Sequence, residues 1–432
     1  MSEADPRPID LRPKEFESST DAPFANDRLN RKESIESLCS VIQNADGPLV
    51  ISVEGAYGTG KSAYLRMCAA HLEQGKAATV QFNAWQQGHT GRPLIDLVAA
   101  LTTELSDKGV WDDVKKTAKQ VGLRAIGYLS RGIIAPNDPD DSSTFDEWAE
   151  IDAGVTSFKA ALREQVSELD TKLVILVDEL DRCEPTYALD LLNKARHLFD
   201  VPGVVIVFGV NRVELGHAVE TRYGSDCDVD GYLRRFVDLS VQLRQPTTEE
   251  WAAYLAHSCR ELADCAPILQ EHNTYVRNIL ALLADSCGGR LRDVEQVLRH
   301  LNLTLPHPSY KRLWPIWVIC MLMLRYLDRD CYESFVTGTV DVWEVLSNMR
   351  QRLAGRDDVR YLDCFVLSLP DGTQIPADED EFVQQYASKI SGSEDDARRV
   401  HSWYTGQIGH SDLFGMPQLE TLHKTIEIGV AT

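Results

Sequence analysis

Short apolar runs alternate with segments of helical spacing through the first half of the chain. Between the runs, apolar residues recur at helical intervals, for example in a helix predicted over residues 187–200. Runs rich in Val, Ile and Leu are typical of strands that are buried on both faces of a parallel sheet. The alternation therefore predicts an α/β domain with a largely parallel, helix-covered sheet. The five predicted strands lie in residues 48–55, 78–86, 171–182, 203–212 and 237–243.

Changes in this pattern predict the domain organisation. The first residues are rich in Pro, Asp, Ser and Glu and lack hydrophobic periodicity, which is typical of a flexible segment. Near the end, RYLDCFVLSLPDGTQI (residues 360–375) predicts a strand and an Asp-Gly turn. We expect a flexible lead-in over 1–26, an α/β domain over 27–246 with a polar insertion at 106–150, a helical domain over 247–350, and an extension of unassigned role over 351–432.

Charge, cysteine content and hydropathy narrow the class of protein. The net charge of −22 argues against a protein that coats nucleic acid through its overall field, and it leaves open whether a local site binds DNA or RNA. The ten cysteines include no CxxC pair, and no signal peptide is recognisable, so a reducing cytoplasmic location is expected. The longest apolar run, within residues 313–327, is too short for a membrane span and predicts a buried helix.

The first predicted strand leads into GAYGTGKS, which has the spacing GxxxxGK[ST] of a phosphate-binding loop. Glycines let the backbone curl so that successive N–H groups point at phosphate oxygens, and the following helix adds its positive N-terminal dipole. Lys61 is expected to neutralise the β- and γ-phosphates, and the Ser62 hydroxyl is expected to hold Mg²⁺. The predicted nucleotide-binding residues are Gly55, Ala56, Tyr57, Gly58, Thr59, Gly60, Lys61, Ser62 and Ala63.

The third predicted strand ends at two carboxylates, Asp178 and Glu179. The carboxyl ends of parallel strands border the crevice in which such sheets bind ligands. Asp178 is expected to hold Mg²⁺, directly or through water, and Glu179 to polarise the attacking water as a general base. A solvated acidic turn is the alternative. Asp181 and Arg182, which follow, either form a structural ion pair or belong to the site, and the sequence leaves this open.

Together these motifs resemble those of the KAP family of P-loop NTPases over roughly residues 20–330. The resemblance also includes DRLNRKE before the first strand, FNAWQ on the second, VDELDR on the third, YLRRFVDLSVQL at the last and LRDVEQVLRHLN in the helical part. It implies a three-layer P-loop sandwich of the additional-strand type. Its mostly parallel five-stranded sheet would place the fourth strand between the loop strand and the Asp178 strand, and a helical domain would follow. Tyr57 replaces the family's common Trp, and Ser62 its frequent Thr.

The resemblance also implies roles for polar residues outside the loop. Asn211, at a position where an acid is frequent, would sense the γ-phosphate. Arg235, with Arg234 as the competing choice, would reach into a neighbour's site in a homo-oligomer. Arg292, with Arg290 as its competitor, would act as a second sensor from the helical domain, and Trp85 of FNAW would be a packing residue. The alternative for Asn211 is a strand-end residue in a turn, and the alternative for the arginines at 234, 235, 290 and 292 is an ordinary surface role. The alternative for Trp85 is a catalytic role.

The function implied by these residues is Mg²⁺-dependent hydrolysis of ATP that drives a conformational change or assembly with a protein partner. ATP is favoured over GTP because the family resemblance is to ATPases and no NKxD-type motif appears. Bacterial relatives in this family are often linked to phage exclusion, which makes phage defence the implied setting. The alternative is a nucleotide-gated scaffold that hydrolyses ATP poorly. A small-molecule kinase is disfavoured by the five-strand plan.

Overall fold

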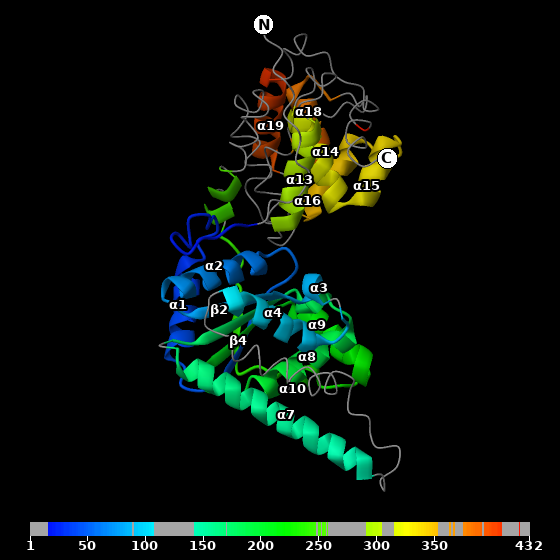
Figure 1. The fold of residues 1–432 in the computed structure, drawn as a ribbon. Coiled ribbons are helices and arrows are strands. Elements are labelled where there is room, and N and C mark those ends of the chain that lie inside the picture. Colours follow the sequence, from blue (N-terminus) through cyan, green and yellow to red (C-terminus); the bar gives the residue numbers. More distant parts are fainter. Residues whose placement is uncertain are drawn as a thin grey trace, which may run out of the picture. The chain divides into compact units, whose positions relative to one another are not determined.

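The chain forms two compact units, one of which is Glu15–Arg244 while the other includes Gln245–Thr432. Figure 1 shows the elements of both units in this computed structural model. Most of the predicted insertion, residues 108–141, lies outside the described residues. The structure describes residues 16–88, 90–107, 142–169, 171–247, 291–304, 315–352, 375–390 and 393–407, with isolated positions from 249 to 257 and from 363 to 423.

The Glu15–Arg244 unit is built on a five-stranded sheet in which every neighbouring pair of strands is parallel. The strand order is β2-β3-β4-β1-β5, so the fourth strand lies between the first and the third, as the additional-strand P-loop fold requires. The predicted fold class is confirmed. The strands are β1 (Leu49–Glu54), β2 (Ala78–Asn83), β3 (Leu173–Asp178), β4 (Val204–Val210) and β5 (Leu239–Gln242).

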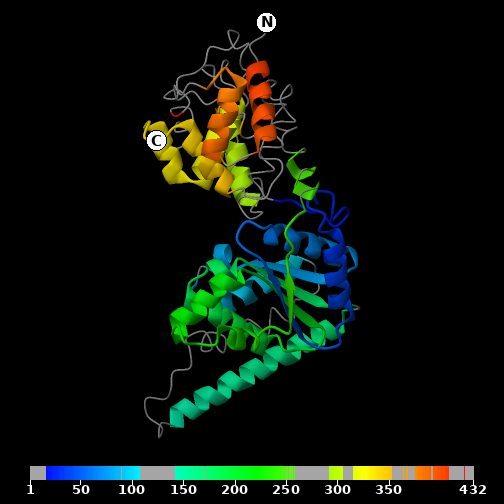
Figure 2. The same cartoon turned by 180° about the vertical axis from the view of Figure 1, so that it is seen from behind.

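Helices cover both faces of this sheet, which makes the unit a three-layer sandwich (Figures 1 and 2). One face packs against α1 (Lys32–Asn44) and α2 (Lys61–Gln74), and the other packs against a larger set of helices. Side chains of β3 and β4 alternate strictly between the two hydrophobic clusters, because successive strand residues point to opposite faces. The helices on the second face include α4 (Pro93–Asp107), α7 (Ser142–Ser167), α8 (Pro185–Leu198) and α9 (Arg212–Tyr223), and the short α10 (Val229–Leu233) adds Leu233.

The ends of several elements differ from the sequence prediction, as the third strand, predicted to reach residue 182, ends at Asp178 before a 3₁₀ turn. Two of the differences have a clear local reason. The helix predicted from residue 187 begins at Pro185, whose fixed φ suits the first turn of a helix. The second strand, predicted to reach residue 86, ends at Asn83. There the Asn83 side chain accepts a hydrogen bond of 2.9 Å from the Gln86 main-chain N–H and caps the short helix α3 (Ala84–Gln87).

The second unit is helical in its described residues. Its core includes the apolar α14 (Pro315–Leu327), in which residues 318–324 are all buried. Asp363, Val366 and Leu367 are helical, so the strand predicted over 360–375 is wrong there, and the Asp-Gly turn lies outside the described residues. The other helices include α13 (Leu291–Thr304), α15 (Arg329–Val336), α16 (Val342–Arg352), α18 (Glu379–Ile390) and α19 (Glu394–Gln407).

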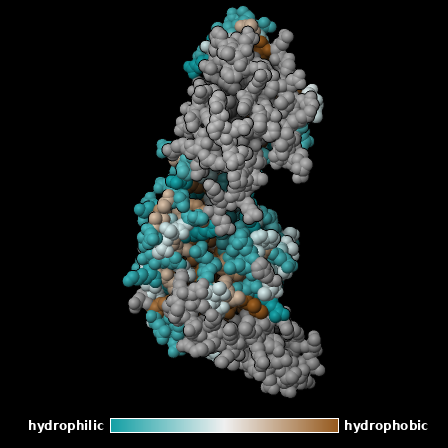
Figure 3. All heavy atoms as spheres, turned by 45° about the horizontal axis from the view of Figure 1, so that its top comes forward, coloured by the Kyte–Doolittle hydropathy of each residue, from teal (hydrophilic) through white to brown (hydrophobic). Residues whose placement is uncertain are grey.

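The surface of the described residues is mixed. On the face shown in Figure 3, hydrophobic residues occur in small groups between hydrophilic ones, which is ordinary for a folded chain. Within the described parts of the chain, every helix falls short of the length or the hydropathy that crossing a bilayer requires.

Candidate functional site

The glycine-rich loop runs from the end of β1 to the start of α2 and adopts a conformation that only glycine accepts easily. Gly58 and Gly60 have φ values of 77° and 89°, in the left-handed region. A Cβ atom on Gly55 would lie 2.7 Å from the Thr59 Oγ1 atom, which donates a hydrogen bond of 2.8 Å to the Ala56 carbonyl. The motif glycines are therefore required by the geometry of the loop itself.

Lys61 lies folded into this loop and is only 8% exposed. Its Nζ donates hydrogen bonds to the carbonyls of Gly55, at 2.7 Å, and Ala56, at 3.1 Å. Burial lowers the pKa of the ammonium, while the carboxylates of Asp181 and Asp178 oppose that shift. The loop thus presents a partly desolvated cation at the N-terminus of α2, which is the environment a phosphate group prefers.

Asp178 and Ser62, the two predicted metal ligands, lie together at the carboxyl edge of the sheet. The Ser62 hydroxyl donates a hydrogen bond to the Asp178 carboxylate. Burial raises the pKa of Asp178, although the Ser62 hydroxyl and the Glu179 N–H, which donates at 2.9 Å, both lower it. A carboxylate and a hydroxyl suit Mg²⁺, which keeps several waters and takes few protein ligands. The residues present therefore fit this ion.

Glu179 has a left-handed backbone, with φ of 55°, which is unusual for a residue with a side chain. Both oxygens of its carboxylate are engaged. Oε1 lies 3.0 Å from Nη1 of Arg182, and Oε2 accepts a hydrogen bond of 3.2 Å from Nδ2 of Asn83. The strained backbone, the ion pair with Arg182 and the hydrogen bond from Asn83 together fix the position of the Glu179 side chain next to Asp178.

Asn83 is a site residue that the sequence prediction missed. Strands β2 and β3 are neighbours in register, with Asn83 opposite Asp178. The reasoning that selected Asp178, a polar residue at the carboxyl end of a strand, applies equally to Asn83. The missing information was the strand order, because only neighbouring strands bring their end residues into contact.

Asp181 and Arg182, left open by the sequence, have separate partners. They lie in a 3₁₀ turn (Leu180–Arg182) after β3, and the ion pair of Arg182 is with Glu179. The Asp181 carboxylate accepts a hydrogen bond from the main-chain N–H of Asn211, and its main-chain carbonyl accepts one of 3.0 Å from the Tyr57 hydroxyl. Its buried Oδ2 has no hydrogen-bond partner among the described residues. This turn therefore links the loop to the end of β4.

The raised pKa of Asp181 gives a testable pH dependence. Burial raises this pKa, while Lys61 lowers it. Above the ordinary Asp pKa of about 3.9, and up to the raised value, the folded state binds more protons than the unfolded chain. The free energy of unfolding therefore falls as pH rises through that window and stays reduced above it. Asp181→Asn is expected to raise Tm by about 2–4 °C at pH 8 without nucleotide, measured by thermal unfolding.

The difference in Tm between Asp181→Asn and wild type should shrink as the pH is lowered to about 4. Asp200→Asn, at an exposed position, serves as the matched control and is expected to leave Tm unchanged within about 1 °C. A lower Tm for Asp181→Asn at pH 8 would contradict the prediction.

Asn211, the predicted sensor, lies at the end of β4 and is largely buried. It caps α9, because its Oδ1 accepts a hydrogen bond of 3.2 Å from the Val213 N–H. The next residue, Arg212, contacts the buried carboxylate of Glu54 at 3.1 Å and the exposed carboxylate of Asp230 at 2.7 Å. Arg212 thus links Glu54, the residue that precedes the loop, to the segment that follows β4.

Arg235, Arg292 and Trp85 are the remaining predicted residues. Arg235 is exposed, and three residues later the Asp238 N–H donates to the Val50 carbonyl, near the amino end of β1 and far along the strand from the loop. Arg292 is exposed on α13 of the second unit, and its competitor Arg290 lies outside the described residues. Trp85 is 58% exposed, so its prediction as a packing residue is wrong. It falls on α3 after the strand has ended, where its side chain is no longer sheet-facing.

A parallel sheet of this strand order, a glycine loop that leads into α2, and a half-buried Asp178 beside Ser62 define a P-loop NTPase domain. The family model described as the KAP family P-loop domain matches residues 31–307, and the chain belongs to this family. The predicted family is confirmed.

Similarity to individual proteins is more distant. The phage T7 exclusion protein of Escherichia coli (strain K12) is 23% identical over 313 residues, which are 64% of this chain and 41% of that protein. The chain thus spans less than half the length of this relative. Two solved structures are similar to this chain at low identity. The Aeropyrum pernix ORC2 protein in ADPNP–ADP complexes is 10% identical with a TM-score of 0.35, and the match covers 96% of this chain and 97% of that chain. AMPPCP-bound DnaA from Aquifex aeolicus is 11% identical with a TM-score of 0.30, and the match covers 93% of this chain and 95% of that chain.

Proposed function

We propose that this chain binds ATP with Mg²⁺ and hydrolyses it, and that the cycle drives a conformational change or assembly with a protein partner. The observation that carries the proposal is the placement of Glu179 beside the cluster of Lys61, Ser62 and Asp178. This cluster would bind the phosphates and the metal, and Glu179 would supply the general base.

Each of these residues would have a separate role when ATP is bound. Lys61 would turn its N–H donors from the loop carbonyls to the β- and γ-phosphates. Ser62 and Asp178 would hold Mg²⁺, which neutralises charge on the phosphates when bound. Glu179 would accept the proton of the attacking water. Asn211 would use Nδ2 toward the γ-phosphate, because its Oδ1 is engaged in capping α9.

The biological setting, the roles of Arg235 and Arg292, and the cellular compartment are also proposals. Because the relative is named for the exclusion of phage T7, we propose a role in bacterial phage defence. Arg235 would act on the site of a neighbouring copy in a homo-oligomer, and Arg292 would act as a second sensor. The six free cysteines among the described residues support the cytoplasm as the expected compartment.

A nucleotide-gated scaffold with little hydrolysis is the second candidate, and one observation favours it. Both oxygens of the Glu179 carboxylate are engaged by Arg182 and Asn83. A base held in this way would need to be released before it accepts a proton from water. In the scaffold, the engaged state would persist with ATP bound, and assembly with a partner would be the output.

Phosphate release from ATP and the Kd for ATP, measured on purified protein, test the proposal. Wild type is expected to turn over, whereas Lys61→Ala is expected to lose about 100-fold or more in ATP affinity, because one partly desolvated cation then no longer meets two phosphates. Lys32→Ala, which removes an exposed lysine on α1, is the matched control and should match wild type. Tight ATP binding without phosphate release by wild type would favour the scaffold, and no ATP binding would overturn both candidates.

A further inference from the structure

We propose that Arg182 acts within its own chain on the γ-phosphate, and that it exchanges its ion pair with Glu179 for an ion pair with the phosphate. This inference rests on the proposed ATPase function. It assigns Arg182 two linked effects. The guanidinium would stabilise charge on the transferred phosphoryl group, and its departure from Glu179 would free an oxygen of the base.

The turn after β3 places Arg182 at the site. Glu179 has left-handed φ and ψ, and its main-chain carbonyl accepts a hydrogen bond of 3.2 Å from the Arg182 N–H, so the chain folds back on itself within four residues. Nη1 of Arg182 then lies 3.0 Å from Oε1 of Glu179. An arginine that follows a strand would normally point into solvent, but this turn directs it toward the catalytic edge of the sheet.

The Tyr57 ring links Arg182 to the phosphate-binding lysine. Lys61 Nζ lies 5.4 Å from the centroid of this ring, and the Cζ atom of Arg182 lies 5.7 Å from the same centroid. The Tyr57 hydroxyl is anchored on the Asp181 carbonyl, so the ring is held by both the loop and the turn. Arg182 is also among the charges that lower the pKa of Lys61. An anion bound by Lys61 therefore lies within the electrostatic reach of Arg182.

Charge favours the exchange once a γ-phosphate is present. The side chains of Arg182 and Glu179 are 30% and 17% exposed, and an ion pair that is open to solvent is weak. A terminal phosphate carries more negative charge than a carboxylate and offers two oxygens to the planar guanidinium, whereas Oε2 of Glu179 already accepts a hydrogen bond from Asn83. When Arg182 moves, Oε1 of Glu179 becomes available to the attacking water. The hydrogen bond from Asn83 to Oε2 keeps the carboxylate in place.

Three variants test this inference by separating binding from the chemical step. Arg182→Gln removes the charge, Arg182→Lys keeps it on a different head group, and Arg222→Gln removes an exposed arginine on α9 as the control. Three quantities are measured for each: the Kd for ATP, kcat, and trapping of ADP by aluminium fluoride, which mimics the transferred phosphoryl group. Arg182→Gln is expected to lower kcat by about 1,000-fold and to abolish trapping, while the Kd for ATP changes less than about threefold.

Arg182→Lys should keep measurable trapping, because its charge can still reach the phosphate, and Arg222→Gln should match wild type in all three measurements. If Arg182→Gln traps ADP and turns over within about threefold of wild type, the inference is overturned while the ATPase proposal stands. The inference is also overturned, and the ATPase proposal again stands, if Arg182→Gln loses ATP affinity in proportion to its loss of kcat. That result would indicate that Arg182 has a structural role. If wild type neither hydrolyses ATP nor traps ADP, both the ATPase proposal and this inference fail.

Discussion

Replacing Glu179 with Gln is expected to lower kcat for ATP by about 10²–10⁴-fold and to leave ATP binding intact. The amide keeps the shape of the side chain and an oxygen that can accept from Arg182 or Asn83, so the turn after β3 should persist. It cannot take a proton from water at neutral pH. The measurement is single-turnover phosphate release at saturating ATP, together with the Kd for ATP of the same preparation.

Glu184→Gln provides the matched control for this prediction. Glu184 lies five residues further along the chain, is exposed, and makes no capping hydrogen bond to α8. Its replacement should leave kcat within about twofold of wild type. Turnover by Glu179→Gln at the wild-type rate would show that another group accepts the proton, and the assignment of Glu179 as the base would then be wrong.

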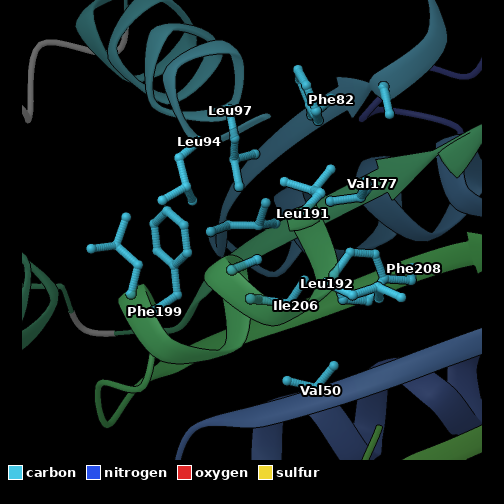
Figure 4. Packing of buried hydrophobic residues seen from close by; sticks show 14 of the residues in the cluster. Val50, Phe82, Leu94, Leu97, Val177, Leu191, Leu192, Phe199, Ile206 and Phe208 are labelled. Carbon is cyan, nitrogen blue, oxygen red and sulfur yellow. The ribbon is translucent and has the colours of Figure 1, made fainter. Parts of the chain in front are cut away.

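Replacing Phe208 with Ala is expected to lower the free energy of unfolding of the Glu15–Arg244 unit by about 3–5 kcal/mol. Phe208 lies on the central strand β4, is 1% exposed, and packs with Leu192 and Ile206 in the cluster seen in Figure 4. It also lines a small cavity with Phe236, so the space left by its ring would add to an existing gap. Equilibrium urea denaturation of the full chain measures the shift.

Val213→Ala is the control for the core prediction, because Val213 is 65% exposed on α9 and buries little surface. Its effect should stay within about 0.5 kcal/mol. A loss below about 1 kcal/mol for Phe208→Ala would mean that the neighbouring side chains collapse into the space, and it would contradict this prediction.

The sequence by itself determined the sheet and the phosphate-binding loop. The buried strands β1, β3 and β4 read as continuous apolar runs because both of their faces are covered, so they could be recognised without knowledge of their order. The edge strands β2 and β5 are less apolar and were recognised from their place in the alternation of strands and helices. The loop could be recognised because its chemistry is local. Gly58 and Gly60 must take positive φ, and Lys61 and Ser62 follow at fixed spacing on the first turn of α2. Information of this kind is contained within about ten consecutive residues.

Only the tertiary structure decided which residues from different strands meet. Asn83 and Glu179 are 96 positions apart, and their contact depends on β2 lying beside β3. The partner of Arg182 depended on the left-handed backbone of Glu179, which no propensity predicts, since such strain persists only where surrounding contacts impose it. Trp85 was misjudged because β2 ends two residues before it. Spacing along the chain determines local conformation, whereas contacts across the sheet follow from strand order.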